Sequence, residues 1–149
     1  MINILFVCTG NTCRSPIAEA LLKARCLDDV LVRSAGIYAV NGGNISLNGK
    51  LVLDNALIPF THETTALDEQ LVDWADLILT MTFSHKQTII QAFPHTKTKV
   101  YMYKEFVTPQ NVQDVSDPYG GDLCTYENTF QELLVLTDEL VKKLRGDLG

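Results

Sequence analysis

Short apolar runs alternate along this 149-residue chain with segments in which apolar residues recur at helical spacing. The apolar runs have the length of buried strands and predict strands over residues 2–7, 31–34, 76–82 and 99–103. The helical spacing predicts helices over residues 16–22, 47–57, 67–75, 85–93 and 126–144. We expect Ser15 and Ser84 to cap the helices that follow them, and Gly146 to end the last one. Residues 39–49 and 104–122 show neither period and are predicted loops.

This alternation of strands and helices indicates an α/β fold. Right-handed βαβ units build a parallel sheet that helices cover on both faces, so we expect a four-stranded sheet in a three-layer arrangement. A chain of this length is expected to form a single domain, residues 1–149. Ligands of such sheets bind beyond the carboxyl ends of the strands. The loop after the first strand, residues 8–15, is therefore the first candidate site.

The loop CTGNTCRS, Cys8 to Ser15, has the features of an oxyanion site. Its backbone N–H groups and the positive end of the following helix form a cradle for a tetrahedral anion. Arg14 offers paired donors to two phosphate oxygens, and Cys8 in the same field is predicted to be a nucleophilic thiolate. Ser15 is expected to donate a hydrogen bond to its sulfur, Asn11 to brace the loop, and Gly10 to adopt a positive φ. The predicted phosphate-binding residues are Thr9, Gly10, Asn11, Thr12, Cys13 and Ser15.

A phosphoryl transfer to cysteine also requires an acid for the leaving group, and Asp117 in the sequence DPYG is the candidate. The same four residues, 117–120, predict a type I turn. Glu105 and Asp114 lie in the same predicted loop and are alternative acids. Tyr119 is expected either to form a wall of the substrate pocket or to cover the core.

Composition mainly excludes partners. Twelve Lys and Arg against eighteen Asp and Glu give a formal charge of −6, which disfavours nucleic-acid binding. The apolar N-terminal run is too short to span a membrane, and the cysteines form no Cys-x-x-Cys pair, so we expect a cytoplasmic protein with free thiols. A monomer is also expected. No nucleotide-binding glycine motif is present, and the Cys and His residues lack zinc-ligand spacing. Neither a cofactor nor a metal is expected.

The motifs CTGNTCRSP and DPYGG, in this order and placement, resemble the low-molecular-weight protein tyrosine phosphatase family over essentially the whole chain. The resemblance implies a flavodoxin-like sheet in the strand order 2-1-3-4. It also implies that Cys8 is the nucleophile, Arg14 the phosphate clamp, Ser15 the thiolate stabiliser and Asp117 the general acid. Cys13 would be a redox partner that forms a reversible disulfide with Cys8.

The resemblance further implies supporting roles behind the loop. Asn11 would be its brace, assisted by Ser34 and His62. For His62, an exposed loop histidine without a role is an equally good interpretation, and for Cys13 so is a packed thiol.

Thr12 favours one branch of this family. Tyrosine-directed members usually carry Ile or Leu at that loop position, whereas the bacterial protein-arginine phosphatases resemble this chain in carrying Thr. A hydroxyl there offers space and a polar contact to a guanidinium. The preferred hypothesis is a phosphatase that hydrolyses phosphoarginine on proteins through a cysteinyl phosphate. A protein tyrosine phosphatase of the same mechanism is the alternative, and a non-catalytic phosphate-binding module is the remote one.

Overall fold

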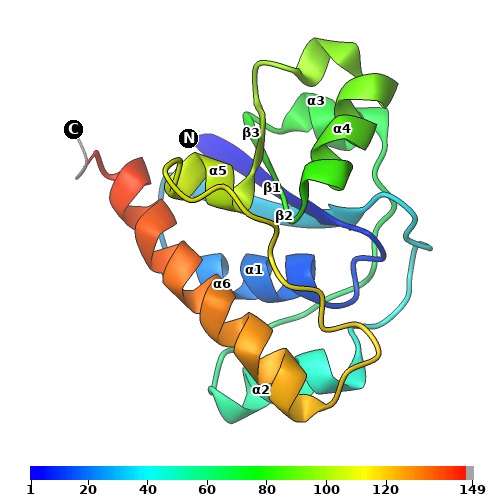
Figure 1. Ribbon diagram of the computed structural model, residues 1–149, viewed down its shortest axis with the longest axis vertical. Helices are drawn as coiled ribbons and strands as arrows, with labels where there is room; N and C mark the ends of the chain where they lie inside the picture. Colours follow the sequence, from blue (N-terminus) through cyan, green and yellow to red (C-terminus); the bar gives the residue numbers. More distant parts are fainter. Residues whose placement is uncertain (147–149) are drawn as a thin grey trace.

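The four strands form one parallel sheet in the order β2-β1-β3-β4, which confirms the predicted topology (Figure 1). The central strand β1 (Ile2–Cys8) pairs with β2 (Val30–Gly36) on one side and β3 (Leu77–Thr80) on the other. β4 (Val100–Met102) extends the sheet beyond β3. The computed structural model describes residues 1–146, so residues 147–149 of the predicted domain lie outside the described range.

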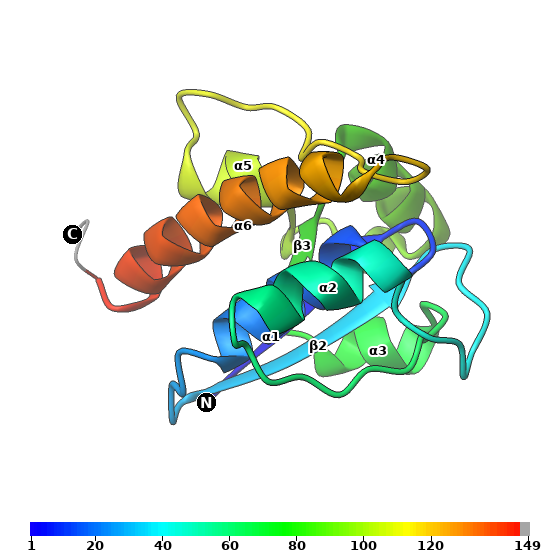
Figure 2. The same ribbon diagram turned by 90° about the horizontal axis from the view of Figure 1, so that it is seen from below.

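Helices cover both faces of this sheet because β1 buries its side chains alternately on each side. Ile4 and Phe6 join the larger core cluster under α1, α2, α5 and α6, whereas Leu5 and Val7 join a second cluster under α3 and α4. Figure 2 shows α6 running along the first face, with α2 near its N-terminal end. The helices are α1 (Arg14–Lys23), α2 (Leu47–Asn55), α3 (Glu69–Trp74), α4 (Phe83–Ala92), α5 (Tyr103–Val107) and α6 (Leu123–Leu144), with a 3-10 turn at Pro94–Thr96.

Both predicted N-terminal helix caps, Ser15 and Ser84, are wrong. Ser15 lies inside α1, which begins at Arg14 without a side-chain cap, because the Ser15 hydroxyl contacts the Cys8 sulfur instead. Thr82, not Ser84, caps α4 by accepting a hydrogen bond from the backbone N–H of His85. The predicted stop at Gly146 agrees with its φ of 75°, a backbone conformation that favours glycine.

The segment 104–122, predicted as one long loop, begins with the last residues of a short helix and ends at the residue that caps the next helix. Residues 104–107 belong to α5, which is too short to show helical periodicity in sequence. Asp122 caps α6 by accepting from the backbone N–H of Thr125, so this helix starts at Leu123 rather than at Tyr126. The true loop is therefore residues 108–122.

Gly36 lets the end of β2 approach the loop after β1. A Cβ at this position would lie 2.6 Å from the carbonyl oxygen of Thr9 and 2.7 Å from the backbone nitrogen of Asn11. Both are backbone atoms, which cannot swing aside as the end of a side chain can. The strand register thus requires glycine where the sheet contacts the loop.

We therefore expect Gly36→Ala to lower the free energy of unfolding by about 1–3 kcal/mol, as overpacking of an interior does. Gly10→Ala is the matched control, because a Cβ there meets nothing nearer than Thr12 Oγ1 at 3.7 Å and the φ is not positive. Urea unfolding of both variants measures the difference. Equal stabilities would contradict the proposed backbone clash.

Candidate active site

The loop between β1 and α1 forms one side of a cavity of about 300 Å³ at the carboxyl end of the central strand. The segment before α6 closes its other side. The cavity is lined by Cys8, Thr9, Gly10, Thr12, Cys13, Arg14, Asp117 and Tyr119. The structure thus brings the predicted nucleophile, clamp, acid and most phosphate-binding residues together, while Asn11, Ser15, Ser34 and His62 lie behind the lining.

The Cys8 thiol lies 2.8 Å from the hydroxyl of Ser15, and both residues are buried. The side-chain amide of Asn11 donates to the same Ser15 oxygen at 2.8 Å. Because that oxygen accepts from Asn11, the hydroxyl hydrogen is free to donate to the sulfur. The Ser15 hydroxyl is thus in the position that its predicted role requires, next to the Cys8 sulfur.

Asn11, rather than Gly10, carries the left-handed backbone conformation, with a φ of 57°. The expectation of a positive φ at Gly10 was wrong. Asn adopts this region more readily than most residues because its short polar side chain bonds to nearby backbone. Here its amide donates to Ser34 Oγ at 3.0 Å as well as to Ser15, and its Oδ1 accepts from the backbone N–H of Thr65 at 2.9 Å. These bonds fit the predicted brace.

His62 and Glu19 support Asn11 from the other side. His62 Nε2 lies 2.7 Å from the carbonyl oxygen of Asn11 and must donate, because a carbonyl only accepts. Its side chain is 6% exposed, so the interpretation as an exposed loop histidine was wrong. Glu19 on α1 accepts from the Ser34 hydroxyl and lies 3.9 Å from His62 Nδ1. Glu19 was not among the predicted site residues, and its one signal in the sequence is its position one helical turn after Ser15.

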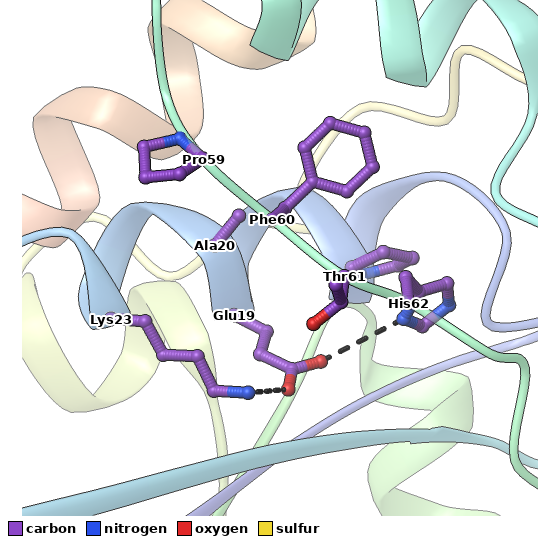
Figure 3. Close-up of a pocket in the computed structure, with 8 residues that line it drawn as sticks. Glu19, Ala20, Lys23, Pro59, Phe60, Thr61 and His62 are labelled. Atoms are coloured by element: carbon purple, nitrogen blue, oxygen red, sulfur yellow. Dashed lines mark hydrogen bonds and ion pairs between the residues drawn. The ribbon is translucent and has the colours of Figure 1, made fainter.

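Figure 3 shows Glu19 between Lys23 and His62 in a second cavity, of about 320 Å³. Pro59 and Phe60 supply part of its apolar lining. The Glu19 carboxylate is already paired with Lys23 at 2.6 Å, and Cys8 does not line this cavity. Glu19 in this cavity supports the loop of residues 8–15 through Ser34 and His62. This second cavity is therefore not the candidate active site.

Arg14 is fixed beneath the first cavity by the segment that carries Asp117. Its guanidinium donates to the carbonyl oxygen of Val115 at 3.1 Å and lies 3.6 Å from the Asp117 carboxylate. The Arg14 side chain is 5% exposed and that of Asp117 is 55% exposed. The clamp is therefore buried, while the candidate acid stands at the opening.

Asp117 is the only one of the three candidate acids that lines this cavity. Glu105 instead binds Lys86 at 2.8 Å and the backbone N–H of Met102, and Asp114 accepts from the backbone N–H of Phe83. Local geometry holds Asp117 in place, because its Oδ1 accepts from the backbone N–H of Tyr119. The structure thus favours Asp117 over both alternatives.

The predicted turn over residues 117–120 is displaced by one residue. The hydrogen bond runs from the backbone N–H of Gly121 to the carbonyl oxygen of Pro118, and Gly120 has a φ of 78°. A positive φ at the third position is typical of a type II turn rather than type I. Tyr119 is 81% exposed and lines the cavity, so it forms a wall of the pocket and does not cover the core.

Cys13 lies within the same cavity lining as Cys8, and both are free thiols. Its sulfur is 3.2 Å from the hydroxyl of Tyr126 and 3.8 Å from that of Ser46. Cys13 is thus a packed thiol in this state, and its disulfide with Cys8 stays a prediction.

His85, in the first turn of α4, contacts the loop although nothing in the sequence indicated this. Its Nε2 lies 2.9 Å from the hydroxyl of Thr9 in the loop. Burial, reinforced by the positive charge of Arg14, lowers the pKa of His85 from the ordinary 6.5 to about 4, against the opposing effect of Asp114 and Asp117. His85 is therefore neutral near pH 7.

Two further properties of residues 1–146 concern metal binding and membrane insertion. In that range, no three His, Cys, Asp or Glu side chains are grouped so that they could hold a metal ion. None of the helices described is at once long and apolar enough to cross a bilayer.

Comparison with known proteins identifies the family to which this chain belongs. The sequence profile described as "Low molecular weight phosphotyrosine protein phosphatase" matches residues 3–148. The chain belongs to this family. Among curated low-molecular-weight phosphatases, it is 43% identical over 144 residues to a protein-arginine-phosphatase of Geobacillus stearothermophilus, covering 97% of each chain. It is 38% identical to the low molecular weight protein-tyrosine-phosphatase PtpB of Staphylococcus haemolyticus, covering 92% and 96%.

A solved phosphatase structure extends the comparison to the site. The structure titled "YwlE arginine phosphatase", a mutant with serine in place of cysteine and a phosphorylated active-site serine, superposes with a TM-score of 0.94. The two sequences are 42% identical, and the match covers 98% of this chain and 97% of the other. The fold of this chain is thus that of the low-molecular-weight phosphatases.

The lowered pKa of His85 predicts a specific loss of stability in acid. Between about pH 6.5 and pH 4 the unfolded chain protonates this histidine and the folded protein does not, so the free energy of unfolding falls as the pH is lowered. His85→Gln removes this titration, so the stability of wild type relative to the variant should decrease across that range. Urea unfolding at several pH values measures it, with His95→Gln, at an exposed histidine paired with Asp73, as control. Parallel curves for wild type and His85→Gln would contradict the prediction.

Proposed function

We propose that this chain is a cysteine-dependent protein phosphatase that hydrolyses phosphoarginine on proteins through a cysteinyl-phosphate intermediate. The observation that carries the proposal is one cavity in which Cys8, Arg14 and Asp117 all take part, with a Ser15 hydroxyl 2.8 Å from the Cys8 sulfur. A nucleophile, an oxyanion clamp and an acid at the opening are the groups that two-step phosphoryl transfer requires.

In the first step the Cys8 thiolate attacks phosphorus and an S–P bond forms. The P–N bond of phosphoarginine breaks, its electron pair passes to the guanidine nitrogen, and Asp117 donates a proton there. The exposed position of Asp117 at the opening supports this role, because a protein substrate reaches the cavity from that side. The products of this step are a free arginine side chain and the cysteinyl phosphate.

In the second step water attacks phosphorus, and the Asp117 carboxylate accepts its proton. The S–P bond breaks, and its electron pair returns to the sulfur as a thiolate. The Ser15 hydroxyl stabilises that thiolate by the contact that it makes with Cys8. Arg14 and the backbone N–H groups of the loop stabilise the charge that develops on the phosphoryl oxygens in both steps.

Thr12 supports the choice of phosphoarginine. It lines the cavity, and its hydroxyl lies 3.5 Å from the Cys13 sulfur, a weak partner that leaves it able to bond to a substrate. A guanidinium presents N–H donors that a hydroxyl can accept, whereas a phenol ring gains more from an aliphatic wall. The similarity to a protein-arginine-phosphatase, at 43% identity, points the same way.

Phosphotyrosine is the second candidate substrate, and the similarity to PtpB and the wall formed by Tyr119 favour it. Both activities would use the same nucleophile and clamp. Phosphorylated proteins in the cytoplasm remain the proposed substrates in either case, and a monomer the proposed state.

The substrate choice is tested by kcat/KM for phosphoarginine and phosphotyrosine peptides on wild type and Thr12→Ile. Wild type should prefer phosphoarginine, and Thr12→Ile should shift the ratio toward phosphotyrosine by about tenfold or more, because it replaces a hydroxyl by an aliphatic wall. Cys8→Ser should show no turnover of either peptide, whereas Cys124→Ser, at an exposed cysteine, should act as wild type. A wild-type preference for phosphotyrosine would overturn the substrate assignment, and turnover by Cys8→Ser would overturn the mechanism.

Replacement of the acid tests the leaving-group step. Asp117→Asn should lower kcat for phosphoarginine by about 100-fold or more, because an amide cannot supply the proton. The loss should be smaller for an aryl phosphate with a weakly basic leaving group. Asp114→Asn is the matched control, since that carboxylate binds the backbone N–H of Phe83. An unchanged rate in Asp117→Asn would assign the role to another group.

A further inference from the structure

His85 is a buried histidine with one ring nitrogen bonded and the other without a partner. It is 7% exposed, its Nε2 lies 2.9 Å from Thr9 Oγ1, and its Nδ1 finds no hydrogen-bond partner within the described residues. Buried polar atoms are rarely left unpaired, so this one calls for a physical explanation. Thr9 belongs to the loop that lines the active-site cavity.

The unpaired Nδ1 determines where the ring proton lies. If the proton were on Nδ1, a buried N–H group would have no acceptor. If the proton is on Nε2, Nδ1 is only an acceptor without a donor, which costs less free energy. Burial and the charge of Arg14 lower the pKa of His85 and exclude the doubly protonated ring near pH 7, despite Asp114 and Asp117 nearby. Nε2 therefore carries the proton and donates it to Thr9 Oγ1.

This donation fixes the direction of the Thr9 hydroxyl. An oxygen that accepts from His85 keeps its own hydrogen free to donate elsewhere. The Thr9 backbone is held as well, because its carbonyl oxygen accepts from the backbone N–H of Tyr38 at 2.9 Å. With the histidine on one side of the hydroxyl, the open direction is the cavity that Thr9 lines.

The fold brings these two residues together. Thr9 directly follows β1, and His85 lies in the first turn of α4, which begins after the neighbouring strand β3. The backbone N–H of His85 donates to the hydroxyl of the cap residue Thr82 at 3.1 Å, so the start of α4 is held in position. The contact thus spans two parallel strands at their carboxyl ends, beside the cavity.

We propose that His85 is a positioning residue that orients the Thr9 hydroxyl as a hydrogen-bond donor to a phosphoryl oxygen of the substrate. The proposal rests on the phosphatase function proposed above and adds to it a donor from a side chain, besides Arg14 and the backbone. His85 itself touches neither the substrate nor the reacting atoms.

The test measures binding of inorganic phosphate and orthovanadate by titration calorimetry at pH 7, together with kcat/KM for a phosphoarginine peptide. Thr9→Val and His85→Leu should each weaken oxyanion binding by about tenfold, the typical effect of losing one hydrogen bond to a charged group. The double variant should lose no more than either single variant, because both remove the same bond. Thr9→Ser and His85→Gln should recover most of the loss, since each retains a hydroxyl or an N–H donor.

Thermal unfolding of each variant separates positioning from folding, and His95→Gln, remote from the cavity, serves as the unaffected control. If Thr9→Val, at an exposed position, binds phosphate as tightly as wild type, the proposal is overturned even if His85→Leu fails to fold. Additive losses in the double variant, or no recovery in His85→Gln, would overturn it too. Wild type that binds oxyanions but hydrolyses neither peptide would refute the proposed function, while the binding data would still decide the role of His85.

Discussion

The structure of this site depends on one residue, Asn11, held in a left-handed backbone conformation by its own side chain. The φ of 57° reverses the direction of the loop, and bonds to Ser15, Ser34 and Thr65 tie the reversal to α1, to β2 and to the segment before α3. A nonglycine residue at positive φ costs about 1–2 kcal/mol, which these bonds offset. The same amide that holds the loop also directs the Ser15 hydroxyl to the Cys8 sulfur. The shape of the loop and the contact between Ser15 and Cys8 therefore depend on one set of bonds.

The surroundings of Asn11 explain why the support extends so far from Cys8. Its carbonyl oxygen accepts from His62, and Glu19 joins His62 and Ser34 beneath it. On the cavity side, Thr9 is held by His85 on α4 and Arg14 by the carbonyl oxygen of Val115. These supports come from α1, β2, α4 and the segments that carry His62 and Val115, so the framework of strands and helices fixes the loop from several directions at once.

The sequence predicted the strands and the residues of the loop because these depend on local patterns, whereas the strand order followed from the resemblance of its motifs to a known family. The apolar runs are continuous, and a cysteine, an arginine and a helix start within one short loop constrain the chemistry strongly. The predictions from sequence were wrong where the outcome depends on tertiary contacts. Glycine was expected at the positive φ on propensity alone, but Asn11 has three partners that only the folded chain supplies. His85 was missed for the same reason, since the chain pattern around it does not reveal that α4 starts beside Thr9.

The site has a buried floor, formed by Cys8 and Arg14, and a rim at its opening, formed by Thr12, Asp117 and Tyr119. Arg14 and Cys8 are almost fully buried, and in the proposed function they contact only the phosphoryl group, which every phosphate monoester or phosphoramidate presents in the same form. Asp117 and Tyr119 are exposed and line the cavity with Thr12, so the proposal assigns to these three the part of the substrate that differs. A change at the rim alters which leaving group is accepted without disturbing the bonds of Asn11. The overall charge of −6 is compatible with this division, because the buried Arg14 supplies a local positive charge that the net value does not reveal. One phosphatase fold can therefore serve different phosphorylated residues by substitution at the rim alone.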